Sequence, residues 1–422
     1  MSDIPLSLEA IRQLLKPLSC KDTCYEIAHT WTPSCFEGCF SIFRSVMRES
    51  LKIYPPLYLV AAILRKEKFE YFTQRFFLDV LQSALAIAVN GSFFVGWVCV
   101  VRKFLGKFYF LSMGLLPGFL ASVMGINVER KERRGILSLY MFNLAIEMIY
   151  NVLKKRGYII PVPYGEVWIL CVTSAIMMYL YRSEDGLRRG ALKSLIRFFV
   201  GSQGPENVKG IKNNQNVPPQ ICSNIQYRLS LDCIKQSLKA FTIGFVLQIL
   251  PQVPKAFRTP SNFPQSLYSP DNFKCGLFLG SYVGIFKVVE YLLAVYRKRQ
   301  DNLNALLAGG LSGLSMMFYR SSTIALYLAS KIGEIMYKRG VSQGILPSIP
   351  HATIWVYSIS TALIFHSASF EVDTVRPSYW KYLNQVTGKR FCEINRQRLG
   401  DIFGLDSAKL FPPDDLYMSL RR

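Results

Sequence analysis

The chain contains 422 residues, of which 50% are apolar and only 18% are charged, against roughly 25% in an average soluble protein. The mean hydropathy is +0.21, and this apolar content excludes disorder, collagen and coiled coil over most of the length. The net charge of +22 suits a polyanionic partner, either nucleic acid or an anionic membrane surface. Short basic groups between apolar segments favour membrane lipids, and since no nucleic-acid motif is present we expect no nucleic-acid partner.

Residues 1–45 form a predicted N-terminal segment with two pairs of cysteines, Cys20 with Cys24 and Cys35 with Cys39. A spacing of four places both thiols of a pair on one face of a helix. With a histidine between the pairs, a small zinc site or an oxidised helical hairpin is one interpretation. Reduced thiols that bind no metal are the favoured one, because the spacing is not that of a zinc finger. No signal peptide is recognisable here, so an oxidising lumen is not indicated.

Residues 46–185 are expected to form a first bundle of membrane helices. A helix that crosses the hydrocarbon core needs about 20 mostly apolar residues, and the segments 80–101 and 108–128 meet this requirement without a charge. Pro55 and Pro56 predict a broken or interfacial helix. The apolar segments of this bundle, in chain order, are 53–64, 80–101, 108–128, 136–153 and 167–181. The cysteines inside apolar runs are expected to be inert small hydrophobic residues: Cys99 and Cys171.

Residues 186–232 are expected to form a basic, flexible linker, because 200–220 are rich in Gly, Asn, Gln and Pro. A second membrane bundle is predicted at 233–372. The basic, amphipathic residues 373–422 are expected to lie on the membrane surface as a tail that binds lipid headgroups. The apolar segments of the second bundle, in chain order, are 240–254, 275–296, 302–319 and 340–370.

The two bundles resemble each other at a shift of 187 residues, which indicates an internal repeat. At this shift Glu147 matches Glu334 and Trp168 matches Trp355, one of the rarest residue types in the chain. Repeated halves are common in membrane proteins, and their shared interface often forms the functional path. The predicted fold class is therefore an all-α polytopic membrane protein made of two tandem, related helical bundles.

Three charged residues inside apolar segments are candidates for an intramembrane role: Glu147, Glu334 and Lys287. A charge at the bilayer centre costs at least about 2.5–3.5 kcal/mol, so it normally faces a partner or water. The hypothesis is that the paired glutamates line a cavity or join the two repeats. The alternative is a residue at a helix end that reaches the interface, which Lys331 and Lys338 favour for Glu334.

Glycines spaced by four occur in both halves and allow helix backbones to approach closely in lipid. We expect them to build the bundles and to touch no substrate. The pairs are Gly114 with Gly118, Gly280 with Gly284, and Gly309 with Gly313.

Several strings along the chain resemble the transmembrane protein 135 family, also called the 52 kDa peroxisomal membrane protein family. They include CYEIAHTW at 24–31, ESLKIY at 49–54, LYLASK at 326–331 and RPSYWK at 376–381. Shorter matching strings lie at 64–66, 106–109, 129–131 and 315–319. The resemblance covers nearly the whole chain apart from about 20 residues at each end and the linker.

This resemblance implies a multi-pass protein of mitochondrial and peroxisomal membranes. It implies a role in mitochondrial fission through a dynamin-related GTPase, and a role in lipid and fatty-acid metabolism. The second half of the family is similar to the Tim17/Tim22/Tim23 group, which implies four-helix membrane units with close glycine contacts.

Catalysis has little support, since no nucleophile elbow, zinc-protease motif or phosphate-binding loop is present. We therefore expect no enzyme and no cofactor. Ser321 predicts a helix cap, and His366 is expected to be a hydrogen-bonded structural histidine. The first hypothesis is a non-enzymatic regulator of organelle division and lipid metabolism. The alternative is a transporter or lipid conduit, and self-association into a homo-oligomer stays open.

Overall fold

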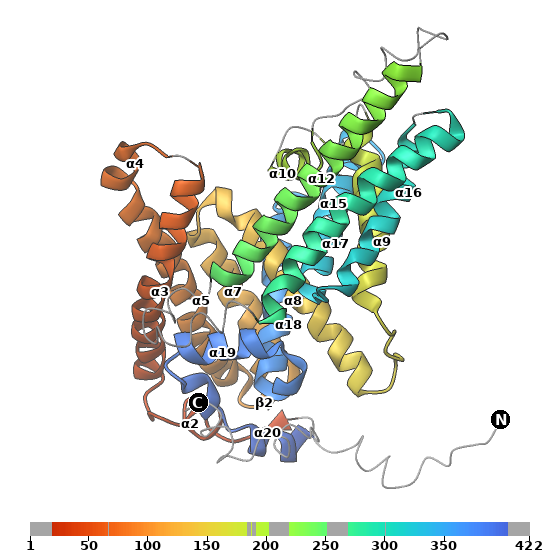
Figure 1. Ribbon diagram of the computed structural model, residues 1–422. Coiled ribbons are helices and arrows are strands. Elements are labelled where there is room, and N and C mark those ends of the chain that lie inside the picture. Colours follow the sequence, from red (N-terminus) through yellow and green to blue (C-terminus); the bar gives the residue numbers. More distant parts are fainter. Residues whose placement is uncertain are drawn as a thin grey trace, which may run out of the picture. The chain divides into compact units, whose positions relative to one another are not determined.

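The computed structural model describes residues 19–65, 67–183, 187, 191–201, 219–250, 269–299 and 301–403. These residues are almost entirely helical (Figure 1). The chain divides into two compact units: unit 1 comprises residues 1–160 and 349–422, and unit 2 comprises residues 161–348. The ends of the two units therefore differ from those of the halves expected from sequence likeness, and the expected linker falls mostly outside the described residues.

Unit 1 begins with two short strands that pair antiparallel, with Cys20 opposite Phe108. Its core is formed by long helices that pack in the order α3, α5, α7, α18 and α8. The elements are β1 (Ser19–Cys20), α2 (Cys24–Ile27), α3 (Cys35–Arg65), α4 (Phe69–Gln74), α5 (Phe76–Leu105), β2 (Phe108–Tyr109), α6 (Phe110–Met113), α7 (Leu115–Val128), α8 (Lys131–Lys155), α18 (Ala352–Phe370), the 3₁₀ helix η4 (Val372–Thr374), α19 (Pro377–Val386), the 3₁₀ helix η5 (Arg390–Glu393) and α20 (Arg396–Phe403).

Unit 2 contains a corresponding set of packed helices, in the order α12, α15, α16, α9 and α17. Asp301 and Ser321 cap α16 and α17 through their side chains, so the predicted cap at Ser321 is confirmed. The elements are α9 (Gly165–Arg182), α10 (Ala191–Val200), α12 (Pro219–Ile249), α15 (Pro270–Arg297), α16 (Asn302–Ser312), the 3₁₀ helix η3 (Gly313–Met317) and α17 (Ser322–Ser342).

The elements before α9 and α18 have matching backbone geometry. Gly157 and Gly344 both adopt the left-handed conformation, with φ of +75° and +74°. Tyr164 and His351, which precede α9 and α18, have φ of +58° and +57°. Left-handed φ is uncommon outside glycine. Both pairs are separated by the same 187 residues that relate the two halves of the sequence.

The double proline does not interrupt α3. Pro55 and Pro56 lie inside a continuous helix of 31 residues, so the prediction of a broken helix is wrong. Proline removes a backbone donor and crowds the preceding turn. Here α3 packs along α5, and Tyr54 and Tyr58 on either side of the prolines are buried against Val80 and Ala84. This packing maintains the helix through the prolines.

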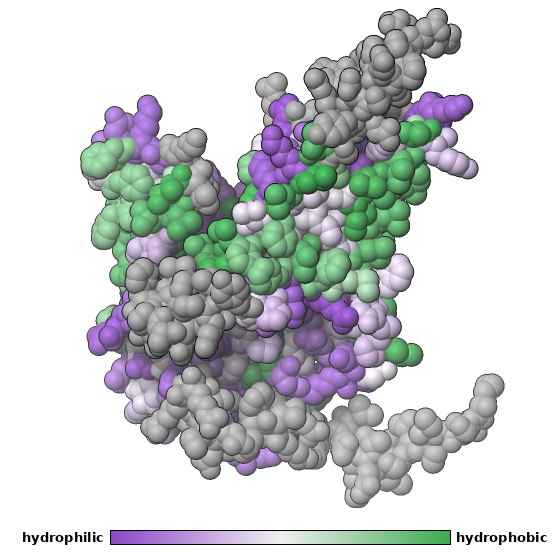
Figure 2. Space-filling view, viewed as in Figure 1, coloured by the Kyte–Doolittle hydropathy of each residue, from purple (hydrophilic) through white to green (hydrophobic). Residues whose placement is uncertain are grey.

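Four of the described helical segments are long and apolar enough to cross a membrane: Phe76–Leu105, Phe110–Val128, Lys131–Lys155 and Pro270–Arg297. The two segments expected most strongly are among them. The segments at 136–153 and 275–296 also qualify despite their internal charges, whereas those at 167–181, 302–319 and 340–370 do not reach the same length and hydropathy. The exposed surface of α15 is apolar, with Leu277, Val288 and Leu292 on it, and Figure 2 shows apolar side chains gathered there.

The C-terminal helices of unit 1 pack on its core. Tyr379, Leu383 and Leu399 are buried. The guanidinium of Arg396 donates to the backbone carbonyls of Ala368 and Phe391, with N···O distances of 3.0 and 2.8 Å. The described part of the predicted tail is therefore an integral part of unit 1. Its binding to headgroups stays a prediction, and residues 404–422 lie outside the described residues.

Candidate functional site

The N-terminal cysteines are distributed differently from the two predicted pairs. Cys20 lies in strand β1, whereas Cys24 begins helix α2, so these two thiols do not share a helical face. Cys39 lies one turn into α3, close to Gly96 of α5. Instead, the structure brings Cys24 and Cys35 together with two residues from elsewhere in unit 1.

Cys24, His29, Cys35 and Cys99 form a compact group that we call the CHCC cluster. One ligand atom from each residue lies within 4.8 Å of those from the other three. The donors come from α2, the loop after it, the start of α3 and the interior of α5. His29 and Cys99 are buried, Cys24 is half-buried and Cys35 is exposed. Thiolate and imidazole groups are the donors that bind Zn²⁺ in structural sites.

Helix caps position the two N-terminal thiols of the cluster. The Thr23 hydroxyl accepts from the Glu26 amide, and the Glu26 carboxylate accepts from the Thr23 amide, which forms a capping box around Cys24. The Ser34 hydroxyl accepts from the Glu37 amide at 3.3 Å, and this places Cys35 in the first turn of α3. Both thiols are therefore held at positions fixed by local hydrogen bonds.

His29 is fixed in one orientation. Its Nδ1 lies 2.8 Å from the Thr32 carbonyl oxygen. Since a carbonyl only accepts, Nδ1 carries the proton in that hydrogen bond. The ring is fully buried, and Nε2 has no hydrogen-bond partner among the described residues. Trp31 packs edge-on against the ring at 6.2 Å between centroids. The free lone pair of a neutral His29 is therefore on Nε2.

The cluster also shifts the acidity of its members. Hydrogen bonding by Cys99, with a smaller effect of His29, lowers the pKa of Cys24 to about 5 against the opposing effect of burial. Burial lowers the pKa of His29, but Cys24, the Thr32 carbonyl and Cys35 together outweigh it and raise the pKa to about 9. These directions describe a thiolate stabilised by its neighbours, which is the ligand form of cysteine.

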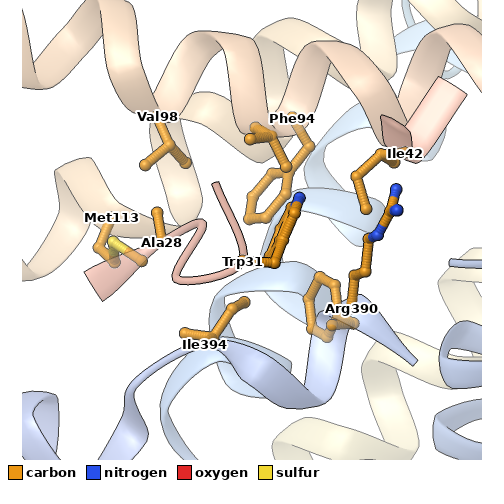
Figure 3. Close-up of a pocket in the computed structure, with 10 residues that line it drawn as sticks. Ala28, Trp31, Ile42, Phe94, Val98, Met113, Arg390 and Ile394 are labelled. Atoms are coloured by element: carbon orange, nitrogen blue, oxygen red, sulfur yellow. The ribbon is translucent and has the colours of Figure 1, made fainter. Parts of the chain in front are cut away.

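The segment that contains Cys24 and His29 is attached to the C-terminal part of unit 1. The Asn395 amide donates to the Ile27 carbonyl at 3.0 Å, and the Thr30 hydroxyl donates to the Glu393 carbonyl at 2.9 Å. Figure 3 shows Trp31 between Phe94 of α5 and Arg390. Residues almost 400 positions apart in the chain thus form one packed cap beside the cluster.

Glu147 has a partner that the local sequence did not reveal. Arg376, just before α19, forms a two-point ion pair with it, in which Nε lies 3.1 Å from Oε1. Both side chains are largely buried. Our expectation that Glu147 lacks a close partner considered only nearby residues, whereas Arg376 comes from a distant part of the chain. This ion pair joins α8 to the segment after α18.

The other two charged candidates lie in unit 2. Glu334 pairs with Lys331 at 2.7 Å and with Lys338 at 2.5 Å on its own helix. Lys287 lies 3.9 Å from Asp232. One turn along α15, Glu290 forms a bidentate ion pair with Arg182 of α9, with both N···O distances at 2.8 Å. The sequence analysis did not single out Arg182, whose partner is more than 100 residues away.

The glycine pairs lie where helices approach closely. A Cβ added at Gly114 would lie 2.6 Å from the Cα of His366 in α18. A Cβ added at Gly313 would lie 2.5 Å from the Cα of Cys171 in α9. In the third pair, Gly280 and Gly284 of α15 face Ser237 of α12, while Gly118 and Gly309 contact α18 and α9. Larger side chains do not fit at these positions without backbone movement.

His366 is not the hydrogen-bonded residue that we expected. Its ring packs against Phe110 and Phe370, with centroid distances of 4.5 and 4.9 Å. Its buried Nδ1 has no hydrogen-bond partner in the described part of the chain. The close approach of α7 at Gly114 brings Phe110 over the ring, so aromatic packing replaces the hydrogen bond.

An all-α architecture with four candidate spans is that of a helical membrane protein. Residues 21–153 match the family model described as the N-terminal cysteine-rich region of Transmembrane protein 135. This match includes all four residues of the CHCC cluster and supports the transmembrane protein 135 family. No solved structure matches the chain.

Sequence reasoning found half of the cluster. Cys24 and Cys35 were candidates because of their spacing, and His29 was noted between them. Cys99 was expected to be an inert hydrophobic residue, because nothing in its surrounding apolar run points to a ligand. Its polar surroundings arise only when α5 packs beside α2 and the start of α3. A signal for it therefore exists only in the tertiary structure.

Proposed function

We propose that the chain is a non-enzymatic, multi-pass protein of mitochondrial and peroxisomal membranes that promotes mitochondrial fission through a dynamin-related GTPase and regulates lipid metabolism. The observation that carries this proposal is the match of residues 21–153 to the cysteine-rich region of Transmembrane protein 135. The four long apolar helices support the membrane location. The net charge of +22 supports contact with anionic lipid surfaces.

Expression of the chain in cells that lack their own copy tests this function. Mitochondria should become shorter and more numerous, and inhibition of the fission GTPase should cancel the change. Fractionation should recover the protein in mitochondrial and peroxisomal membranes after alkaline carbonate washing. Unchanged mitochondrial length at normal protein levels would contradict the fission role, and release by carbonate would contradict the membrane location.

We further propose that the two halves are copies of one Tim17-like unit. The equal spacing of the Gly157/Gly344 and Tyr164/His351 pairs supports duplication. So does the equivalent packing order of the helices in the two units. The glycine contacts of α7 and α16 support a Tim17-like mode of packing, in which small residues allow close backbone approach.

A transporter or lipid conduit is the second candidate, and one observation favours it. Unit 2 contains two ion pairs, Arg182–Glu290 and Lys287–Asp232, on or beside the candidate span α15. Charged residues in membrane helices often mark a substrate path. Flux of fluorescent lipids and small anions into proteoliposomes tests this. Flux that Glu290→Gln abolishes and Lys338→Ala preserves would favour the conduit, while no flux would favour the regulator.

A further inference from the structure

The CHCC cluster has the donors and dimensions of a four-ligand zinc site. Zinc lies about 2.3 Å from a thiolate sulfur and about 2.0–2.1 Å from an imidazole nitrogen in tetrahedral geometry. This requires donor atoms roughly 3.5–3.8 Å apart. The four donors already lie within 4.8 Å of one another. Side-chain movements of about 1 Å or less would therefore bring all four to binding distance.

His29 presents its nitrogen atoms as zinc-bound histidines do. Such histidines usually donate the other ring N–H to a carbonyl or carboxylate, which fixes the ring. Nδ1 of His29 makes this contact with the Thr32 carbonyl. Nε2 is buried and has no hydrogen-bond partner among the described residues. Buried polar atoms are rarely left without a partner, and a metal ion would supply one here.

The surroundings of the cluster suit its charge and allow entry. Three thiolates and a neutral imidazole around Zn²⁺ carry a net charge of −1, and binding releases the displaced protons to solvent. Arg102 is one turn after Cys99 on α5 and hydrogen-bonds the carbonyls of Lys21 and Asp22. Its charge partly balances the site. The exposed side chain of Cys35 gives the ion a route from solvent.

We propose that Cys24, His29, Cys35 and Cys99 bind one Zn²⁺ in a closed, structural site that fastens the N-terminal segment to α5. All four positions are taken by protein ligands, so the site has no open position for a substrate. The ion joins two short N-terminal elements to α3 and to a candidate membrane span, across 75 residues of chain. It holds β1, α2 and their C-terminal contacts in place.

Metal analysis of the full-length protein, purified in detergent without chelators, tests the proposal. The wild-type protein should contain about one zinc per chain. After chelation, added Co²⁺ should give the thiolate charge-transfer band and the intense visible bands of tetrahedral cobalt. Cys99→Ser and His29→Gln should weaken zinc binding by at least about 100-fold, since even changes to residues behind the ligands typically cost about 10- to 100-fold.

Cys39→Ser is the matched control, because Cys39 lies in the same region but outside the cluster; it should retain one zinc. The cobalt spectrum of the wild-type protein keeps the test decisive if the ligand variants fold poorly. A metal-free protein that gives no tetrahedral cobalt spectrum would overturn the proposal. So would a disulfide between any two of the three cysteines in protein isolated under thiol-blocking conditions.

Discussion

In unit 1, α18 packs against α7 and α8; in unit 2, α9 packs against α16 and α17. Each of these helices follows α8 or α17 in the chain but belongs to the other unit. The two units differ in what surrounds this shared arrangement. Unit 1 has the N-terminal segment, the CHCC cluster and α19 and α20, whereas the described part of unit 2 has α10 and the Arg182–Glu290 pair.

This comparison shows that adjacency in the chain and packing partners are different properties here. Residues 161–348 lie between two parts of unit 1, so unit 1 is complete only after the chain has passed through unit 2. Pairings between residues far apart in sequence slow folding, because the loop must close before the contacts form. The metal-binding cluster uses residues 24–99 only, and it can assemble before α18 is made.

The largest expected effect comes from removing α18 and the residues after it. A chain that ends at Ser348 loses the buried side chains of Ile364, Phe365 and Phe370, each worth about 1.5–3 kcal/mol. Together with α19 and α20, this loss exceeds a typical stability of about 5–15 kcal/mol. Unit 1 should then be cut rapidly in limited proteolysis, while fragments of unit 2 persist.

A chain that ends at Phe403 is the control and should resist protease as the full chain does. Equal resistance of unit 1 in the chain that ends at Ser348 would show that α18 is not part of it.

Substitution of the close-contact glycines should have the next largest effect. Gly114→Ala and Gly313→Ala place a methyl group against the backbones of α18 and α9, and overpacking of this kind typically costs about 1–3 kcal/mol. Both variants should unfold at lower temperature in detergent, to a similar extent in the two units. Equal stability of variant and wild type would mean that these helices are further apart.

Two other glycines provide matched controls, one in each unit. Gly135 in α8 and Gly333 in α17 have no heavy atom within 4 Å of an added Cβ. Alanine in an exposed helix is favoured over glycine by up to about 1 kcal/mol. Gly135→Ala and Gly333→Ala should therefore leave the melting temperature unchanged or raise it.

The ion pairs should rank below the glycines. Glu147→Gln and Glu290→Gln each leave an arginine that is only 15% and 13% exposed, and we expect a loss of about 1–3 kcal/mol. Double variants that also replace Arg376 or Arg182 by Gln should lose less than the sum of the single changes. Strict additivity in thermal unfolding would show that the partners do not interact.

The smallest effect is expected at Lys338, whose side chain is 70% exposed. Its ion pair with Glu334 lies on one face of α17, and exposed pairs contribute about 0–1 kcal/mol. Lys338→Ala should shift stability by less than about 0.5 kcal/mol, and high salt should remove the difference. A loss as large as that of Glu147→Gln would contradict the ranking.

Local signals in the sequence predicted local features well. Ser321 was expected to cap a helix and does so, and the apolar runs at 80–101 and 108–128 are helices long enough to span. The sequence could not show that Arg376 meets Glu147 or that Cys99 joins the cluster, because those partners are brought together by packing. The prolines of α3 misled for the same reason, since burial of Tyr54 and Tyr58 outweighs the local preference.

Disulfide cross-linking in intact membranes tests the packing of α9 and α18 most directly. A Cβ added at Gly310 lies 3.6 Å from the Cβ of Ala175, and one at Gly118 lies 3.4 Å from the Cβ of Phe365. Bridged cysteines have Cβ atoms about 3.5–4.5 Å apart. Gly310→Cys with Ala175→Cys, and Gly118→Cys with Phe365→Cys, should each form a disulfide under mild oxidation, identified by peptide mapping. Cross-linking of Gly118→Cys to Ala175→Cys instead would contradict this arrangement.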